Sequence, residues 1–174
     1  ANKFGISLST LRKINNKWDD MIYPGQKLNI PNGATSGTSG NSTLAAPGKS
    51  VIAYTEAELD LLARLVTAEA ESEPYQAQVG VAAVVVNRVK SNIFPNTITS
   101  VIYQKSDGFY QFTPVENGWI NKPTTQIARK AALEALNGSD PSNGALYYFD
   151  DSATNKWLWS KPIKAYIGRM VFVY

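Results

Sequence analysis

Residues 62–89, LARLVTAEAESEPYQAQVGVAAVVVNRV, contain two apolar segments separated by Ser72-Glu73-Pro74. The first segment predicts the end of an amphipathic helix, and the second predicts a helix that is strongly apolar. Because proline disfavours helical backbone in the residue before it, the first helix should end near residue 72. The stretch therefore predicts two consecutive helices joined by a short break.

A start signal precedes the first helix. Thr55-Glu56-Ala57-Glu58 predicts a capping box, with Thr55 as the N-cap and Glu58 at the third helical position. The following apolar residues define one face of the helix, with Leu65 at its edge: Leu59, Leu62 and Val66. At about 100° per residue, Glu69 lies about 20° from Leu62, so it belongs to this apolar face.

Three glutamates follow closely here, and they are not equivalent. Glu69 alone is directed inward, whereas Glu71 lies on the opposite side and faces water. Glu73 would return to the inner face, but Pro74 takes it out of helical geometry. Apolar neighbours and the negative end of the helix dipole both disfavour ionised Glu69, so its pKa should rise toward neutrality and make it a proton donor. The pattern also fits a helix-end glutamate whose carboxylate reaches solvent.

The composition limits the available chemistry. The 174 residues include no Cys and no His, which excludes disulfides, thiol and Ser-His-Asp nucleophiles and the usual zinc sites. Acid–base chemistry must then use carboxylates, tyrosine or lysine. Calcium needs several oxygen ligands close together, whereas these glutamates spread around the helix, so neither a metal nor a cofactor is expected. No run approaches 18 apolar residues, so no membrane span is expected.

Residues 32–50, NGATSGTSGNSTLAAPGKS, have the composition of a flexible linker. They separate a small module at residues 1–31 from a larger domain at residues 51–174. Residues 1–50 contain six Lys or Arg against two Asp, whereas the rest contain eleven against twelve acidic residues. The basic surplus predicts an anionic polymer as partner of the N-terminal part, and nucleic acid is not expected because no basic stripe interleaved with aromatics is present.

The small module contains FGISLSTLRKINN (4–16) and YPGQKLNIP (23–31), which predict a short helix, a proline-glycine turn and a strand at residues 26–30. These motifs resemble the second half of a LysM domain. That family has a βααβ fold and binds glycans that contain N-acetylglucosamine, chiefly peptidoglycan and chitin. The family's first strand and most of its first helix would precede Ala1, so this is a partial module. A short basic helix–turn–strand leader is the alternative interpretation.

The rest of the larger domain combines helices with short apolar strands. NTITSVIYQ and TTQIARKAALEALNG predict helices, and GALYYFDD and GRMVFVY predict strands. A Gly-and-aromatic segment, GFYQFTPVENG, lies between the two helices. With helices first and a small sheet-like region around a cleft, this order predicts an α+β domain of lysozyme size.

Several motifs of the larger domain occur in a specific order: LARLVTAEAESEPYQAQVGVAAVVVNRV, FPNTITSVIYQ, YQFTPV, ARKAALEALNGSDPSNGALYYF and KWLWS. Together they closely resemble the catalytic domain of the spore cortex-lytic enzymes, the SleB/CwlJ type of bacterial cell-wall hydrolase, over nearly all of residues 54–174. The resemblance implies a mostly helical lysozyme/lytic-transglycosylase-like fold with a small β region. It implies cleavage of the β-1,4 bond between N-acetylmuramic acid and N-acetylglucosamine in spore cortex peptidoglycan. It also implies a location outside the cytoplasm, in the spore cortex or coat or in the cell wall.

The family's catalytic glutamate is the first of its GEARGE motif, which the resemblance places at Glu69, the residue that the helical wheel also selects. Here the motif reads AEAESE, so Glu71 and Ser72 replace an arginine and a glycine. Losing a positive neighbour and gaining a carboxylate should raise the pKa of Glu69 further, provided that the side chains are close.

Ordinary glycosidases use two carboxyl groups about 5–10 Å apart. The possible partners of Glu69 are Glu73, Glu116, Asp150 and Asp151. None of them resembles an inward-facing nucleophile, and turn chemistry accounts for most of them. This favours a lytic transglycosylase, which the resemblance also implies. Glu69 would protonate the glycosidic oxygen and then act as base on the muramic 6-hydroxyl, which closes a 1,6-anhydro ring.

Substrate contacts are predicted at several polar and aromatic residues. Gln111 resembles the glutamine that occupies the equivalent place in lytic transglycosylases, which implies binding of the N-acetyl group. Stacking faces for sugar rings are available on four aromatic residues, for each of which core packing is the alternative role: Phe112, Tyr147, Tyr148 and Trp157. Strand alternation directs Tyr147 and Tyr148 to opposite faces, so at most one should face the cleft. Asn87 and Arg88 are either further ligands or a helix-end interaction.

The rival function is that of a non-catalytic spore-coat or cell-wall glycan-binding protein with a degenerate enzyme domain. Glu69 discriminates between the two. An unpaired carboxylate on an apolar face costs a few kcal/mol, and a degenerate domain has no reason to keep one there.

Overall fold

The computed structural model describes residues 11, 15, 28–30 and 50–174. The chain divides into two compact units, residues 1–42 and 43–174, which are described separately. In the first unit, the Asn15 side chain bonds to both backbone groups of Asn29, since Nδ2 donates to its O (2.9 Å) and Oδ1 accepts from its N (2.6 Å).

The predicted closing strand of the small module is not formed at residues 28–30. The backbone groups of Asn29 bond to a side chain there instead of to a neighbouring strand. The other predicted elements of this module, apart from Leu11, and the linker up to residue 49 lie outside the described residues.

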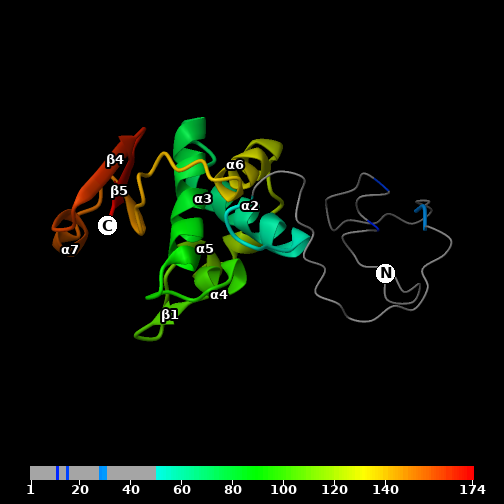
Figure 1. The fold of residues 1–174 in the computed structure, drawn as a ribbon, viewed down its shortest axis with the longest axis horizontal. Coiled ribbons are helices and arrows are strands. Elements are labelled where there is room, and N and C mark those ends of the chain that lie inside the picture. Colours follow the sequence, from blue (N-terminus) through cyan, green and yellow to red (C-terminus); the bar gives the residue numbers. More distant parts are fainter. Residues whose placement is uncertain (1–10, 12–14, 16–27, 31–49) are drawn as a thin grey trace. The chain divides into compact units, whose positions relative to one another are not determined.

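Helices α2 (Glu56–Ala70) and α3 (Tyr75–Lys90) lie at the centre of the larger unit (Figure 1). The predicted capping box starts α2, because the Thr55 side chain accepts from Glu58 N and the Glu58 carboxylate accepts from Thr55 N. Helix α2 ends two residues earlier than predicted, and Pro74 is the N-cap of α3. Every residue of α3 from Ala77 to Val86 is buried, as its apolar sequence predicts.

Helix α6 (Gln126–Leu136) packs on both α2 and α3. Its buried face consists of small side chains with one leucine, which lets the helices approach closely: Ala128, Ala131, Ala132, Ala135 and Leu136. Shorter elements complete the helical part: α4 (Ile98–Ile102), the hairpin of β1 (Lys105–Ser106) and β2 (Phe109–Tyr110), α5 (Thr113–Glu116) and the 3₁₀ helix η2 (Trp119–Asn121). Of these, α4, α5 and η2 contact α2.

An antiparallel sheet of order β3-β5-β4 lies on the side of α3 opposite α6 (Figure 1). Its strands are β3 (Tyr147–Asp150), β4 (Ile163–Ile167) and β5 (Met170–Val173), with α7 (Lys156–Trp159) between β3 and β4. The central strand β5 is buried along its length. Close packing against α3 requires glycine at position 80, because a Cβ there would lie 2.6 Å from the Phe172 ring.

The predicted α+β organisation is confirmed. One core cluster joins the helices to Met170 and Phe172 of β5, and a smaller one on the other face of the sheet contains Phe149, Val171 and Val173. In the part of the chain that the structure describes, no helix has the length and apolarity needed to cross a membrane.

Candidate active site

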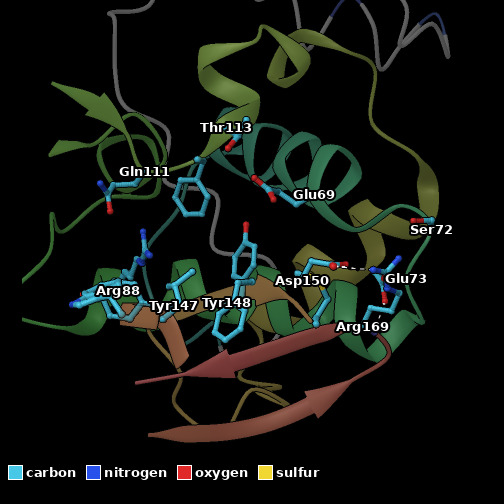
Figure 2. A pocket seen from close by; sticks show the side chains of 15 residues that line it. Glu69, Ser72, Glu73, Arg88, Gln111, Thr113, Tyr147, Tyr148, Asp150 and Arg169 are labelled. Atoms are coloured by element: carbon cyan, nitrogen blue, oxygen red, sulfur yellow. Dashed lines mark hydrogen bonds and ion pairs between the residues drawn. The ribbon is translucent and has the colours of Figure 1, made fainter. Parts of the chain in front are cut away.

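A cavity of about 470 Å³ opens beside the last turn of α2. Its walls come from α2, α3, the segment before α5, β3, α7 and the start of β5 (Figure 2). Six of the seven residues that the sequence selects line it: Glu69, Gln111, Phe112, Tyr147, Tyr148 and Trp157. Residues that are up to 88 positions apart in the chain therefore meet at one site.

Glu69 is partly buried and points into this cavity (Figure 2). Burial raises the pKa of the Glu69 carboxyl to about 7, because the carboxylate loses hydration, and the Tyr148 hydroxyl opposes the shift. The predicted rise in pKa is confirmed. Glu71 is exposed, as predicted, but it is not among the causes of the shift, so the further rise in pKa, which was expected only for close side chains, does not occur.

The Tyr148 hydroxyl faces the same space as Glu69 (Figure 2). It is buried and forms no hydrogen bond of ordinary length among the described residues, but it lies close enough to the Glu69 carboxyl for each group to affect the pKa of the other. Burial and the nearby Glu69 charge raise the pKa of Tyr148 well above its usual value, so the phenol keeps its proton. A neutral hydroxyl donor and a carboxyl group thus lie close together at the wall of one cavity.

Strand alternation separates the two tyrosines as predicted. Tyr148 packs in the main core against Phe112 and Phe172, whereas Tyr147 packs on the other side of β3 against Phe94 and Trp157. Yet both tyrosines line the cavity, so the expectation that at most one would face it is wrong. Strand β3 is at the edge of its sheet, and a cavity along a free edge can reach side chains of both faces.

The remaining aromatic candidates differ in their exposure. Phe112 is only 3% exposed, and its ring packs against the Arg88 guanidinium and Tyr148. Trp157 is 55% exposed and meets the Tyr147 ring edge-to-face at 5.6 Å. Gln111 is exposed at the rim. Trp157 and Gln111 are therefore open to a ligand, whereas Phe112 mainly supports the wall.

The structure does not bring Asn87 into the cavity. Its Nδ2 donates to Asp140 Oδ2 (2.9 Å) and to Ala145 O (3.2 Å), which ties the end of α3 to the loop before β3. The amide is occupied by these bonds, so its assignment as a substrate ligand is corrected to the helix-end alternative.

Arg88, for which the sequence leaves a ligand role and a helix-end interaction open, lines the cavity. The side chain is 4% exposed, and its Nε donates to Leu146 O (2.7 Å). Its guanidinium lies over the rings of Phe94, Phe112 and Tyr147 at 4.9–5.2 Å, and NH1 has no hydrogen-bond partner among the described residues. The sequence signal for this position is a charged residue in a helix that is apolar on nearly every side. A buried charge is costly, so other parts of the fold must supply partners for it.

Two further carboxylates, Glu73 and Asp150, line the same cavity. This corrects the expectation that no second carboxyl faces the site. Arg169 holds both: its backbone N donates to Glu73 Oε2 (3.0 Å), and its NH2 pairs with Asp150 Oδ1 (2.9 Å). Bonds from Ser152 and the Arg169 charge lower the pKa of Asp150, so it stays ionised. Asp151 pairs with Arg169 Nε, and Glu116 does not line the cavity.

Comparison with known families matches the cell wall hydrolase family to residues 72–173 and the LysM domain to residues 1–31. Among curated proteins, a spore cortex-lytic enzyme of Oceanobacillus iheyensis is 42% identical over 142 residues, which is 80% of this chain and 50% of that protein. One from Bacillus cereus is 44% identical over 120 residues, which is 68% of this chain and 45% of that protein. The chain thus spans about half the length of the curated relatives it matches.

Two solved structures share the fold. One is the catalytic domain of the germination-specific lytic transglycosylase SleB from Bacillus anthracis, with a TM-score of 0.64 and 43% identity over 70% of this chain and 97% of that one. The other is the catalytic domain of the Bacillus cereus SleB protein, with a TM-score of 0.63 and 38% identity over 87% of this chain and 100% of that one. The resemblance inferred from the sequence is confirmed, and the chain belongs to the cell wall hydrolase family.

Proposed function

We propose that this protein cleaves peptidoglycan glycan strands at the β-1,4 bond between N-acetylmuramic acid and N-acetylglucosamine, with Glu69 as general acid. The main support is the partly buried Glu69 carboxyl, whose pKa of about 7 keeps a large fraction protonated near neutral pH. It points into a cavity large enough for a sugar ring (Figure 2). An acid with that pKa can protonate a leaving oxygen and then accept a proton in the next step.

The reaction proposed is that of a lytic transglycosylase. Glu69 gives its proton to the glycosidic oxygen as the bond to muramic C1 breaks, and N-acetylglucosamine leaves with a free 4-hydroxyl. The Glu69 carboxylate then takes the proton of the muramic 6-hydroxyl as that oxygen bonds to C1. The ring that forms is a 1,6-anhydro muramic unit, no water is consumed, and Glu69 ends protonated. One carboxyl is sufficient for both steps.

Other residues of the cavity have supporting roles in this proposal. Gln111 binds the N-acetyl group of the substrate from the rim. Trp157 and Tyr147 offer ring faces to the sugars, and the protonated Tyr148 hydroxyl donates to an oxygen near the bond that breaks. Phe112 completes the wall.

A hydrolase with two carboxyl groups is the second candidate. It is favoured by one observation, namely that Glu73 and Asp150 line the cavity with Glu69. In such a mechanism, one of them would orient a water molecule or form a glycosyl intermediate. However, both are held by Arg169, which limits their freedom to approach a sugar, and the pKa of Asp150 is lowered, which makes it a weaker base.

The substrate proposed is spore cortex peptidoglycan, because the relatives with the stated identities are spore cortex-lytic enzymes. The match to LysM supports a glycan-binding module at residues 1–31. The corresponding location is the cell wall or spore cortex.

Mass spectrometry of the muropeptides released from purified cortex tests the proposal. The expected products carry 1,6-anhydro muramic ends, and Glu69→Gln should release none. Glu116→Gln is the matched control, because Glu116 is exposed and lines neither this cavity nor the one described below. Muramic ends that carry added water would establish the hydrolase instead, and equal release by Glu69→Gln and the parent would remove Glu69 from the mechanism.

A further inference from the structure

A second cavity, of about 370 Å³, lies on the other side of Glu69. It shares Glu69 and Ser72 with the first cavity, so the two meet at the proton donor. Its own walls are the last turn of α2 and the region of η2, with Trp119 and Lys122 as its large side chains. Nothing in the proposed mechanism so far uses this space.

The backbone of helix η2 at Trp119 is held in place by packing and by hydrogen bonds. Ile120 is 3% exposed and anchors η2 against α2, whereas the neighbouring Trp119 is 50% exposed. Gly118 has a φ of 80°, a backbone conformation that glycine adopts without strain, and the Trp119 N donates to Asn117 Oδ1 (3.0 Å). An exposed tryptophan held this way provides an apolar ring face at the cavity wall.

Charged groups surround that ring face. Lys122 Nζ lies over the Trp119 ring, 4.0 Å from its centre, and the exposed residue Glu71 lines the same cavity. A flat aromatic ring bordered by one donor group and one acceptor group matches the chemistry of a pyranose, which has apolar C–H faces and a rim of hydroxyls.

We propose that the cavity of Trp119 and Lys122 binds the N-acetylglucosamine that leaves when the bond is cleaved. This inference rests on the proposed function. A glycosidic oxygen has one sugar on each side, so a proton donor that reaches it needs space for a sugar on both sides. The two cavities that meet at Glu69 provide that space.

The direction of the strand follows from the polar groups of the first cavity. It is the larger of the two and contains two buried donors that form no hydrogen bond of ordinary length among the described residues, Arg88 NH1 and the Tyr148 hydroxyl beside Glu69. Buried donors are expected to find acceptors when a ligand binds. N-acetylmuramic acid is bulkier than N-acetylglucosamine and carries a lactyl group, whose oxygens can accept hydrogen bonds. It therefore occupies the first cavity, and N-acetylglucosamine occupies the second.

Steady-state kinetics of the full chain on cortex fragments test the second cavity. Trp119→Ala should lower kcat/KM about tenfold, the loss expected for one stacking contact, while the melting temperature stays unchanged because the ring is half exposed. Trp119→Phe keeps a ring and should retain most of the activity. Phe109→Ala is the matched control, since Phe109 is 67% exposed and lines neither cavity. Parent-like kinetics of Trp119→Ala, in an enzyme that Glu69→Gln inactivates, would overturn the inference and leave the proposed function standing.

Sugar titration tests the direction. N-acetylglucosamine and N-acetylmuramic acid are added separately to Glu69→Gln of the full chain, and the indole N–H signal of Trp119 is followed by NMR. N-acetylglucosamine should shift this signal, and N-acetylmuramic acid should not. A shift with muramic acid alone, or with neither sugar, would overturn the assignment even if the enzyme cleaves peptidoglycan as proposed.

Discussion

At the scale of single residues, the account depends on Glu69. This side chain lies on the apolar face of α2, in the last turn of the helix and beside a cavity, and burial raises its pKa to about 7. A raised pKa means that ionising Glu69 is harder in the folded protein than in the unfolded chain. The site therefore keeps a proton donor at some loss of stability, and both consequences can be measured.

Replacing Glu69 with glutamine should stabilise the protein in a pH-dependent way. Below pH 4.5 the carboxyl is protonated in the folded and unfolded states, so the replacement has little effect. Above pH 7 it is ionised in both, and the folded parent bears the full desolvation, which the shift from 4.5 to about 7 puts at roughly 3 kcal/mol. Melting temperatures at pH 4 and pH 8 check this. A variant that is less stable than the parent at pH 8 would indicate a structural role for Glu69.

Catalysis should depend on the same proton. With a general acid of pKa about 7, kcat/KM should fall about tenfold per pH unit above that value, because the protonated fraction falls in proportion. Initial rates on soluble cortex fragments between pH 5 and pH 9 measure this limb. A rate that stays constant up to pH 9 would be incompatible with Glu69 as the acid.

Sequence reasoning located Glu69 because helical periodicity places a residue on a face without any tertiary information. It left Arg88 undecided and failed for Glu73 and Asp150, because the presence of these residues in the cavity depends on contacts between distant segments. An apolar helix such as α3 has no polar face to separate Arg88 from its neighbours, and Asp150 was interpreted as part of a turn although it ends β3. The glutamate that replaces the family's arginine at position 71 has no effect on the pKa of Glu69, because Glu71 is exposed to solvent.

At the scale of elements, the distance between α3 and the sheet sets the width of the site. Gly80 lets β5 approach α3, where the Phe172 ring is fully buried. The Phe172 ring contacts the Tyr148 ring, with centroids 6.2 Å apart. The position of the Tyr148 hydroxyl, which faces Glu69, therefore depends on the position of β5. The helix–sheet spacing and the geometry of the cavity are thus linked.

Gly80→Ala should both destabilise the protein and reduce its activity. Its Cβ would lie 2.6 Å from a ring that has no room to move, and such overpacking costs about 1–3 kcal/mol, against a gain of about 1 kcal/mol in helix propensity. We expect a net loss of about 1 kcal/mol in the free energy of unfolding, measured by urea denaturation. Gln76→Ala, on the exposed side of α3, is the control and should cause no loss. Equal stability of Gly80→Ala and the parent would show that the sheet can shift freely.

The longer helices and two strands of the larger sheet could be predicted because their patterns are local. Capping residues and apolar periodicity gave α2, α3 and α6, and the apolar runs gave β3 and β5. Strand β4 was missed, since three of its five residues are exposed and it is defined only by pairing with β5. The prediction of a strand at residues 26–30 is wrong at residues 28–30. The sequence there alternates as in a strand, but the backbone groups of Asn29 bond to the Asn15 side chain and not to a neighbouring strand.

At the scale of the whole molecule, the chain combines a unit matched by the LysM family with a unit matched by the cell wall hydrolase family. The larger unit contains both core clusters and both cavities within residues 50–174. Its stability and chemistry should therefore be independent of the smaller unit.

Residues 50–174 alone should have the melting temperature and the soluble-substrate kcat of the full chain. Retention on insoluble cortex should fall if residues 1–31 bind glycan, because a tethered module raises the local concentration of the enzyme at the wall. Calorimetry and co-sedimentation with purified cortex measure the two effects. A lower melting temperature for residues 50–174 would show that the units stabilise each other.

The most direct test of the central claim is a carbon-13 NMR titration of the Glu69 carboxyl, assigned by its absence from the spectrum of Glu69→Gln. The account predicts a midpoint near pH 7, with the group largely protonated at pH 5. A carboxyl already fully ionised at pH 5 would contradict it.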